Sequence, residues 1–211
     1  MTDTMLVKID SWNDGDTIPD KYSFCISAKE NHVALGKNIS PAIRWSGAPD
    51  GTASFVILCT DPGVPTDIEL VNKEDIKIPI DTSRFTFYHW VLADIPENIN
   101  QLAEGVESEG IQPGGKDFGN TNHGNRGINF YTIWFANDEQ MKGNYGGYDG
   151  PCPPWNDELV HEYYFTVYAL DVDRLNLDGG FTGPDVEQAM QGHILAQGTY
   201  LGKYSLNPDH R

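Results

Sequence analysis

The chain has 211 residues, and its hydrophobic share of 39%, with five Trp, ten Tyr and nine Phe, is enough to build a core. Its 14 basic residues stand against 31 acidic ones, and the resulting net charge of −17 disfavours binding to nucleic acids or anionic membrane surfaces. No apolar run approaches the roughly 18 residues of a membrane span, so we expect none.

The first half of the chain predicts strands separated by turns and by one polar segment. A short strand is expected at 42–46, and the apolar run SFVILCT at 54–60 predicts a buried strand that ends in a turn at Asp61. The aromatic run FTFYHWVLAD at 85–94 predicts a second long strand. Between these two strands, 67–83 is polar and is interpreted as an insertion.

A second insertion is expected at 121–147, which is rich in glycine and asparagine. It also contains Phe130, Tyr131, Ile133, Trp134 and Phe135. Such an aromatic cluster is not typical of a disordered linker, so we favour a packed flap over an exposed interaction surface. After it, YYFTVYALD at 163–171 predicts a third, central strand.

One helix is expected near the C-terminus. Its apolar face repeats with helical spacing at Val186, Ala189, Met190, His193 and Ile194. Thr182 is the candidate N-cap, with Pro184 and Asp185 in the first turn. Gly198 would end the helix, and 199–205 would return as a strand.

This order of many strands and one late helix predicts a mainly-β sandwich with a peripheral C-terminal helix. We expect residues 1–211 to form a single domain, with insertions at 67–83 and 121–147. The 22 glycines and 13 prolines agree with many turns rather than long helices.

The three cysteines, Cys25, Cys59 and Cys152, are too few and odd in number to predict a disulfide framework. Cys152, between prolines, is interpreted as a small buried side chain, with a reactive thiol as the alternative. The N-terminal residues lack the basic and apolar regions of a signal peptide. We therefore expect a cytoplasmic protein in a reducing compartment.

Three polar residues lie at or near the ends of the strong strands: Asp61, His89 and His161. If the strands are neighbours, the three side chains meet in one pocket, walled by the stiff turn at 150–154 (GPCPP). A carboxylate raises the proton affinity of nearby imidazoles, and an imidazolium pair suits a phosphate or carboxylate. Asp61 would orient one imidazole, and binding would strengthen below about pH 6.5.

Each residue also has a plainer interpretation. His89 could be a satisfied core residue, and Asp61 alone is more often a turn former. His193 is interpreted as helix packing, while His32 and His123 lie in polar sequence and are expected to face solvent.

Other chemistries are less favoured. A metal site of two histidines and one carboxylate lacks any local ligand pair. A hydrolase using Asp61 and His161 as an acid–base pair lacks a recognisable nucleophile motif. We expect no enzymatic activity, no cofactor and no metal.

Seven blocks, in order, resemble the phosphatidylethanolamine-binding protein family, in its bacterial and archaeal branch, which is similar to the Raf kinase inhibitor-like proteins. The blocks are NISP with IRW (38–45), APDGT with SFVILCTDP (48–62), DPGVP (61–65), YHWV with IP (88–96), LAEG (102–105), GYDGPCPP (147–154) and HEY with FTVYALD (161–171). The C-terminal helix and strand also resemble the family's ending, so the likeness covers nearly the whole chain.

The resemblance implies a β-sandwich with one anion pocket, carried by position onto Asp61, His89, Pro151, His161 and Tyr163. It implies a non-enzymatic, regulatory binding protein for a small phosphorylated or carboxylate anion, such as a phospholipid headgroup. A kinase or protease is a candidate protein partner, as is a second copy of the chain in a homodimer. The alternative is an inhibitor that contacts its target through 121–147.

The chain departs from the family pattern at two positions. Gly63 replaces the second Asp of D-P-D-x-P, which removes a carboxylate from the pocket rim. Glu162 replaces the Arg after the second His, which removes a positive charge near the site. We expect both to affect ligand choice, and we expect His89→Ala or His161→Ala to weaken anion binding while folding is retained.

Overall fold

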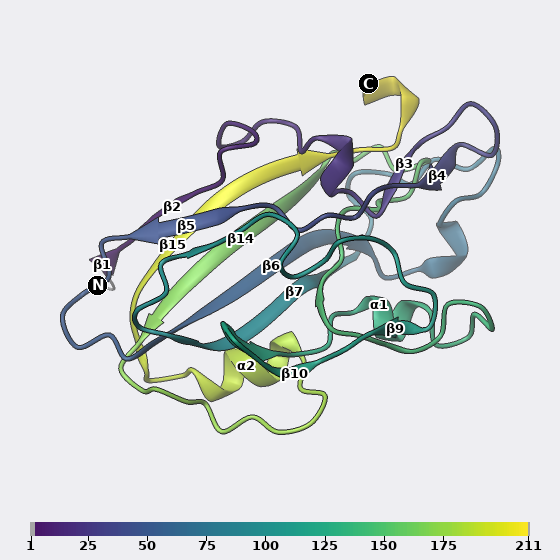
Figure 1. Cartoon of the computed structure of the whole chain (residues 1–211). Coiled ribbons are helices and arrows are strands. Elements are labelled where there is room, and N and C mark those ends of the chain that lie inside the picture. Colours follow the sequence, from purple (N-terminus) through teal and green to yellow (C-terminus); the bar gives the residue numbers. More distant parts are fainter. Residues whose placement is uncertain (1–2, 211) are drawn as a thin grey trace.

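The computed structural model describes residues 3–210, and an eight-stranded sheet forms its centre (Figure 1). Along the sheet the order is β1 (Asp3–Thr4), β15 (Ile194–Tyr204), β14 (His161–Leu170), β6 (Ser54–Pro65), β7 (Arg84–Pro96), β11 (Gly124–Arg126) and β10 (Gly119–Thr121), with β13 (Gly147–Tyr148) also paired to β7. The central strands β15, β14, β6 and β7 are antiparallel to their neighbours, while β1 joins β15 in parallel.

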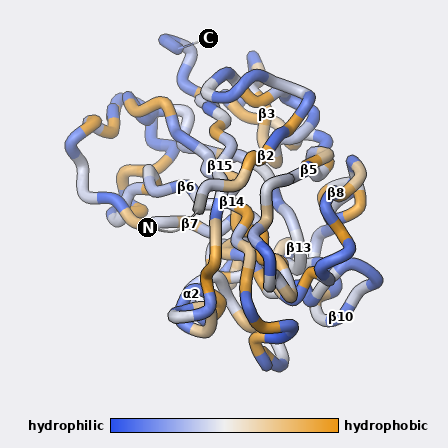
Figure 2. Tube along the Cα trace, turned by 90° about the vertical axis from the view of Figure 1, so that its left-hand side faces the viewer, coloured by the Kyte–Doolittle hydropathy of each residue, from blue (hydrophilic) through white to orange (hydrophobic). Residues whose placement is uncertain are grey.

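Each face of the central sheet is covered by a different layer. A three-stranded sheet of β2 (Leu6–Lys8), β5 (Ile43–Ser46) and β8 (Gln101–Leu102) contributes to the larger apolar cluster on one face, where Ile57 lies. The short helix α2 (Gly183–Ala189) covers the other face, and Val56 packs there with Val186. Apolar stretches run along the central strands around β14 in Figure 2. The alternation along β6 therefore builds two cores from one strand.

Shorter elements surround one end of this sheet. They are η1 (Asp20–Tyr22), the hairpin of β3 (Cys25–Ser27) and β4 (Val33–Leu35), η2 (Ile68–Leu70), β9 (Gly115–Lys116), α1 (Tyr131–Trp134), β12 (Asn144–Tyr145) and η3 (Pro208–His210). Several of them meet at the end of the sheet where β6 finishes and β7 and β14 begin.

The predicted fold class is confirmed: the chain is mainly β with few helices. The three strong strands are present, but β6 does not stop at Asp61 as predicted. It continues to Pro65, paired with β7 through an irregular register between Asp61 and Val64. Such an irregularity re-aims side chains, so Asp61 sits on a distorted strand rather than in a free turn.

The predicted C-terminal helix exists but is shorter than its apolar spacing suggested. Asp185 accepts hydrogen bonds from the backbone N–H and hydroxyl of Thr182, both at the helix start. The helix ends at Ala189, and Gly192 has φ of +84°, which reverses the chain before β15 begins at Ile194. Gly198, predicted to end the helix, therefore lies inside a strand.

The prediction of no disulfide is wrong. Cys25 and Cys152 are disulfide-bonded with Cα atoms 4.7 Å apart, and Cys59 is buried and free. The two cysteines are separated by 127 positions in the sequence, which carries no sign of their proximity; they meet because β3 lies against the 150–154 turn. Cys152 is thus not a free reactive thiol. Disulfides persist in oxidising compartments, so the cysteines no longer favour a reducing cytosol.

The helices are all short. α2, the longest within residues 3–210, has seven residues, so no described helix is long and apolar enough to cross a membrane.

Candidate functional site

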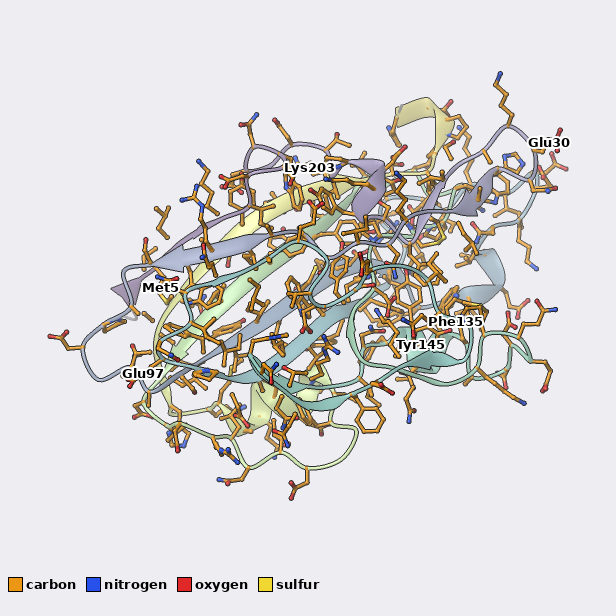
Figure 3. The ribbon with its side chains drawn as sticks, in the orientation of Figure 1. Met5, Glu30, Glu97, Phe135, Tyr145 and Lys203 are labelled. Carbon is orange, nitrogen blue, oxygen red and sulfur yellow. A yellow bond between two sulfur atoms is a disulfide. The ribbon has the colours of Figure 1, made fainter. Side chains whose placement is uncertain are left out.

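A cavity of about 180 Å³ opens at the end of the central sheet where the shorter elements gather. It is lined by Phe24, Cys25, Leu35, Asp61, Val64, Val71, Asn72, Phe87, His89, Tyr131, Trp134, Phe135, Cys152, Pro153, Pro154 and Tyr163. Figure 3 places the labelled Phe135 beside α1 at this end of the molecule. The cavity therefore has a small polar floor and mainly apolar walls, as ligand pockets commonly do.

Asp61, at the floor, forms a buried pair with His161. Nδ1 of His161 donates to Oδ2 of Asp61 at 2.7 Å, and the backbone N–H of Gly63 donates to Oδ1 at 2.7 Å. Burial alone would raise the pKa of the Asp61 carboxyl, but His161 and His89 lower it below its usual value. Asp61 is therefore an ionised, fixed acceptor, and it orients an imidazole as the sequence predicted.

His161 lies behind Asp61 and does not line the cavity. Its Nε2 donates to Oδ2 of Asp157 at 3.1 Å, so both ring nitrogens bind carboxylates. Burial disfavours the charge, yet the carboxylates of Asp61 and Asp157 outweigh it and raise the pKa of His161 to about 9. Two donated hydrogen bonds match an imidazolium, so His161 is cationic at neutral pH.

His89 differs from His161 in both position and charge. It lines the cavity, and its Nδ1 donates to the backbone oxygen of Asp149 at 2.8 Å. Burial lowers the pKa of His89, although Asp61 opposes the shift. The ring is therefore neutral near pH 7, with Nε2 left as an acceptor. The sequence predicted an imidazolium pair; the structure instead separates a buried cation from a neutral imidazole.

Tyr163 completes the polar floor. Its ring lies edge-on to His89, with centroids 5.2 Å apart, and its side chain is fully buried. Burial and the nearby carboxylate of Asp61 raise the pKa of Tyr163, so its hydroxyl lies close to that carboxylate. The hydroxyl nevertheless makes no hydrogen bond of good geometry, as for only two other buried side chains within residues 3–210, Ser23 and Trp45, neither of which lines the cavity. Buried hydroxyls are normally satisfied, so the Tyr163 hydroxyl still has hydrogen-bonding capacity on the cavity floor.

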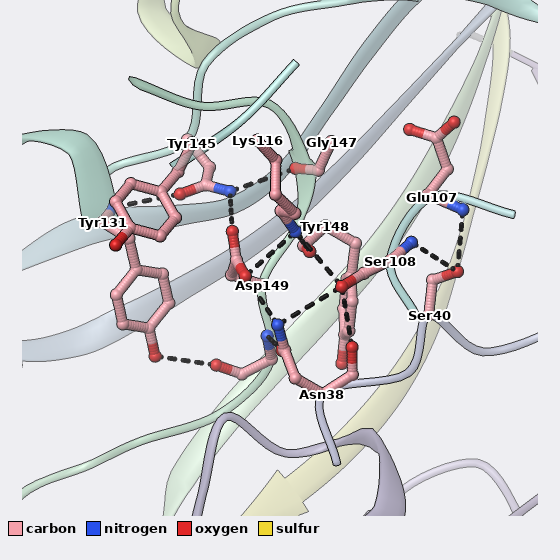
Figure 4. Close-up of polar contacts among 12 residues, drawn as sticks. Asn38, Ser40, Glu107, Ser108, Lys116, Tyr131, Tyr145, Gly147, Tyr148 and Asp149 are labelled. Atoms are coloured by element: carbon pink, nitrogen blue, oxygen red, sulfur yellow. Dashed lines mark hydrogen bonds and ion pairs between the residues drawn. The ribbon is translucent and has the colours of Figure 1, made fainter. Parts of the chain in front are cut away.

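Figure 4 shows a buried polar network around Asp149, the residue whose backbone oxygen is bonded to His89. Asp149 accepts hydrogen bonds from Asn38 at 2.6 Å and Asn129 at 2.8 Å, and pairs with Lys116 at 3.0 Å. The side-chain oxygen of Asn38 accepts from the N–H of Gly150 at 2.8 Å. Because the backbone oxygen of Asp149 accepts the hydrogen bond of His89 Nδ1–H, this network fixes the ring's position and tautomer.

Pro151 lies behind the cavity wall rather than in it. Its carbonyl accepts the N–H of Cys25 at 3.0 Å, next to the disulfide. Cys152, Pro153 and Pro154 form the wall instead. Of the five predicted site residues, Asp61, His89 and Tyr163 meet in the cavity, whereas Pro151 and His161 support it.

The 121–147 segment contributes the opposite wall through α1. Tyr131 is buried and donates to the carbonyl of Gly150 at 2.8 Å, whereas Ile133 and Trp134 remain exposed. The segment thus combines the packed flap with an exposed apolar face. A second hollow of about 490 Å³ adjoins the cavity, sharing Val71, Asn72, Phe87 and Trp134 with it.

The structure clarifies the two departures from the family pattern. A Cβ at Gly63 would lie 3.1 Å from Oδ1 of Asp61 and 3.3 Å from Nδ1 of His161, so an Asp there would crowd the pair. Glu162 lies 3.5 Å from Lys203 and accepts a hydrogen bond from Tyr164, away from the cavity. Position 162 therefore does not set the charge of the cavity.

The remaining histidines lie elsewhere. His32 stacks on Trp155 at 3.9 Å and is partly exposed, while His193 lies beyond the end of α2 and pairs with Asp171. His123, expected to face solvent, is instead largely covered and bonded to Glu107. Within residues 3–210 no group of His, Cys, Asp or Glu side chains is arranged to hold a metal ion.

Sequence reasoning missed Asp157 and Arg84, which lie behind His161. Asp157 binds His161 and pairs with Arg84 at 2.8 Å in buried surroundings. The signal available was weak: Asp157 precedes His161 by four residues, and Arg84 directly follows the 67–83 segment. Neither position lies in a block of the family resemblance.

Comparisons with known proteins agree on one family. A family sequence model described as phosphatidylethanolamine-binding protein matches residues 8–205. UPF0098 proteins from Aquifex aeolicus and Methanothermobacter thermautotrophicus are 33% and 30% identical, covering 92% and 95% of this chain and 84% and 98% of those proteins. A solved phosphatidylethanolamine-binding protein homologue from Chlamydia trachomatis is 26% identical, with a TM-score of 0.63 and coverage of 97% of this chain and 99% of that one.

Proposed function

Because this chain belongs to the phosphatidylethanolamine-binding protein family, we propose that it is a non-enzymatic binding protein that holds a small phosphate or carboxylate head between Asp61, His89 and Tyr163. The observation that carries the proposal is the buried hydroxyl of the cavity-lining Tyr163, which lies near Asp61 but makes no well-formed hydrogen bond. A ligand oxygen would satisfy it, and apolar walls would enclose the rest of the molecule.

Anion binding at this floor requires a proton. Asp61 is ionised and would repel an anion, whereas neutral His89 offers an acceptor rather than a donor. Protonation of His89 supplies the missing donor and charge, so binding of the anion takes up a proton. Affinity is therefore expected to rise as the pH falls. His161 is already charged below about pH 9 and contributes little to this change.

The test is calorimetric titration of phosphoethanolamine and inorganic phosphate at pH 5.5 and pH 8. Wild type is expected to bind more tightly at pH 5.5. Tyr163→Phe removes only the hydroxyl and is expected to weaken binding roughly tenfold, as for a hydrogen bond to a charged group. Tyr164→Phe, on the opposite face of β14, is the matched control. Equal affinity for Tyr163→Phe and wild type contradicts the proposal, as does an absence of binding at both pH 5.5 and pH 8.

A second candidate function is inhibition of a protease or kinase through the cavity mouth. The exposed side chains of Ile133 and Trp134 on α1 favour it. Deleting 121–147 is unsuitable as a test because it would remove Tyr131 and Tyr145 from the core. Ile133→Asp with Trp134→Ser leaves that core in place. If the chain inhibits a panel of serine proteases and protein kinases, the double variant should lose inhibition; retained inhibition excludes this surface.

A further inference from the structure

Five residues on and behind the cavity floor form a closed ring of hydrogen bonds. Arg84 donates to both carboxylate oxygens of Asp157, at 2.8 and 2.9 Å, and Asp157 accepts from His161. His161 donates to Asp61, which also accepts the N–H of Gly63. The carbonyl of Gly63 accepts a hydrogen bond from Arg84, so the path returns to its start.

The ring is buried and balanced in charge. The side chain of Arg84 is 10% exposed, and those of Asp61, Asp157 and His161 are at most 2% exposed. Two carboxylates face one guanidinium and one imidazolium, so the formal charges cancel. Loss of one charged member leaves a buried charge uncompensated, which is a costly arrangement in a protein interior.

Arg84 links this ring to the segment predicted as an insertion. Its guanidinium donates to the backbone oxygen of Pro79 at 3.0 Å and to that of Ile80 at 3.4 Å. Asn156, beside Asp157, further anchors the segment by donating to the carbonyls of Leu70 and Ile76, each at 2.9 Å. The 67–83 segment therefore presents Arg84 at a fixed place behind the floor.

We propose that Arg84 and Asp157 are positioning residues of this site, which fix His161 against Asp61 and thereby hold the Asp61 carboxylate in one orientation and charge on the cavity floor. Neither residue lines the cavity, so both act through His161. The role in ligand binding rests on the proposed function, whereas the positioning of His161 can be measured without any ligand.

The groups that face His161 come from several elements. They are Asp61 on β6, Asp157 before β14, and His89 on β7, which is neutral near pH 7 and repels the His161 charge only when it is itself protonated. Removing Asp157 or Arg84 should shift the titration of His161 in opposite directions. Without the Asp157 carboxylate the imidazolium loses an anionic partner, while without the Arg84 guanidinium it faces two anions with less competition.

The first arm of the test follows the His161 ring by NMR across a pH titration, without ligand. Wild type is expected to titrate near pH 9, Asp157→Asn at a clearly lower pH, and Arg84→Met at a higher pH. Arg84→Lys keeps the positive charge, so in this variant His161 should titrate close to its wild-type value. It is the variant to measure if Arg84→Met does not fold. Glu158→Gln is the neighbouring control. The proposal is overturned if the pKa of His161 shifts in the same direction in Asp157→Asn and Arg84→Met, or if it does not shift in Asp157→Asn.

The second arm compares binding of inorganic phosphate at pH 5.5 and pH 8. In Asp157→Asn the pKa of His161 is lower than in wild type. The ratio of the affinity at pH 5.5 to that at pH 8 should therefore exceed the wild-type ratio, by about tenfold for each unit that this pKa falls below 8. If Asp157→Asn loses the same factor of phosphate affinity at pH 5.5 and at pH 8, the role of Asp157 is merely structural. If wild type binds neither phosphate nor phosphoethanolamine, the proposed function fails while the NMR arm still decides the positioning of His161.

Discussion

The polar floor of the cavity, formed by Asp61, His89 and Tyr163, and its mouth, lined by Leu35 and Trp134, differ in burial and in polar contacts. At the floor, Asp61 on β6 and His161 on β14 are almost fully buried and bonded to each other, and Asp157 accepts the second hydrogen bond of the His161 ring. At the mouth, Leu35 is 61% and Trp134 41% exposed, with no comparable polar anchoring. The floor can therefore fix the protonation and direction of a ligand's head, whereas the mouth offers apolar area that suits many ligand bodies.

The largest expected effect comes from breaking the floor with His161→Ala. This change leaves Asp61 buried without its cation, while Asp157 keeps only Arg84, and such a loss costs about 3–5 kcal/mol of unfolding free energy. The sequence alone suggested that this variant would fold normally; the two carboxylates change that expectation. Urea unfolding at pH 7 is the measurement, with His193→Ala, which breaks an exposed pair, as control. A cost similar to that of the control would contradict a charge-paired floor.

A pH titration of stability sharpens the comparison without any mutation. The folded protein holds the His161 proton to about pH 9, against 6.5 for an unperturbed histidine. This stabilisation is complete below pH 6.5 and is lost as the pH rises through 9; the difference corresponds to about 3 kcal/mol. Urea midpoints measured from pH 6 to 10 should fall over this window. A curve that is flat there in wild type would exclude a cationic His161.

The smallest effect is expected at the mouth. Trp134→Ala removes a partly exposed ring and should change the unfolding free energy little, while lowering affinity for phenyl phosphate by a few-fold, about 1 kcal/mol. Affinity for inorganic phosphate, which reaches only the floor, should stay unchanged. Ile80→Ala, an exposed apolar residue outside both hollows, is the control. An equal loss of affinity for phenyl phosphate and for inorganic phosphate would mean that Trp134 affects binding of the phosphate group at the floor rather than contact with the phenyl ring at the mouth.

The sequence predicted the floor better than the mouth, for a physical reason. Strand periodicity and the family blocks identified Asp61, His89 and Tyr163, because residues at the ends of neighbouring strands meet wherever those strands pair. Partners such as Arg84 and Cys25 were missed. Each is the first residue of its strand, β7 or β3, and directly follows an irregular segment, whose path in space leaves no periodic pattern in the sequence.

The sequence also misplaced the end of the C-terminal helix and did not separate the charge states of the two histidines. Apolar spacing extended the C-terminal helix to Ile194, because a strand that follows at once continues the apolar pattern. The charge states of the two histidines were also not predictable. His89 and His161 have the same ordinary pKa, and only the carboxylates that touch His161 separate them.

The disulfide makes residues 25–152 a covalently closed loop, and this has a practical consequence for limited proteolysis. Lys73 is exposed within that loop, so trypsin cleavage after it yields two fragments, 1–73 and 74–211, that stay joined. A gel without reductant would show one band of full-length mass, and a gel with reductant would show two. A nicked preparation therefore passes for intact protein on a gel without reductant, although Asp61 and His161 then lie on separate polypeptide fragments.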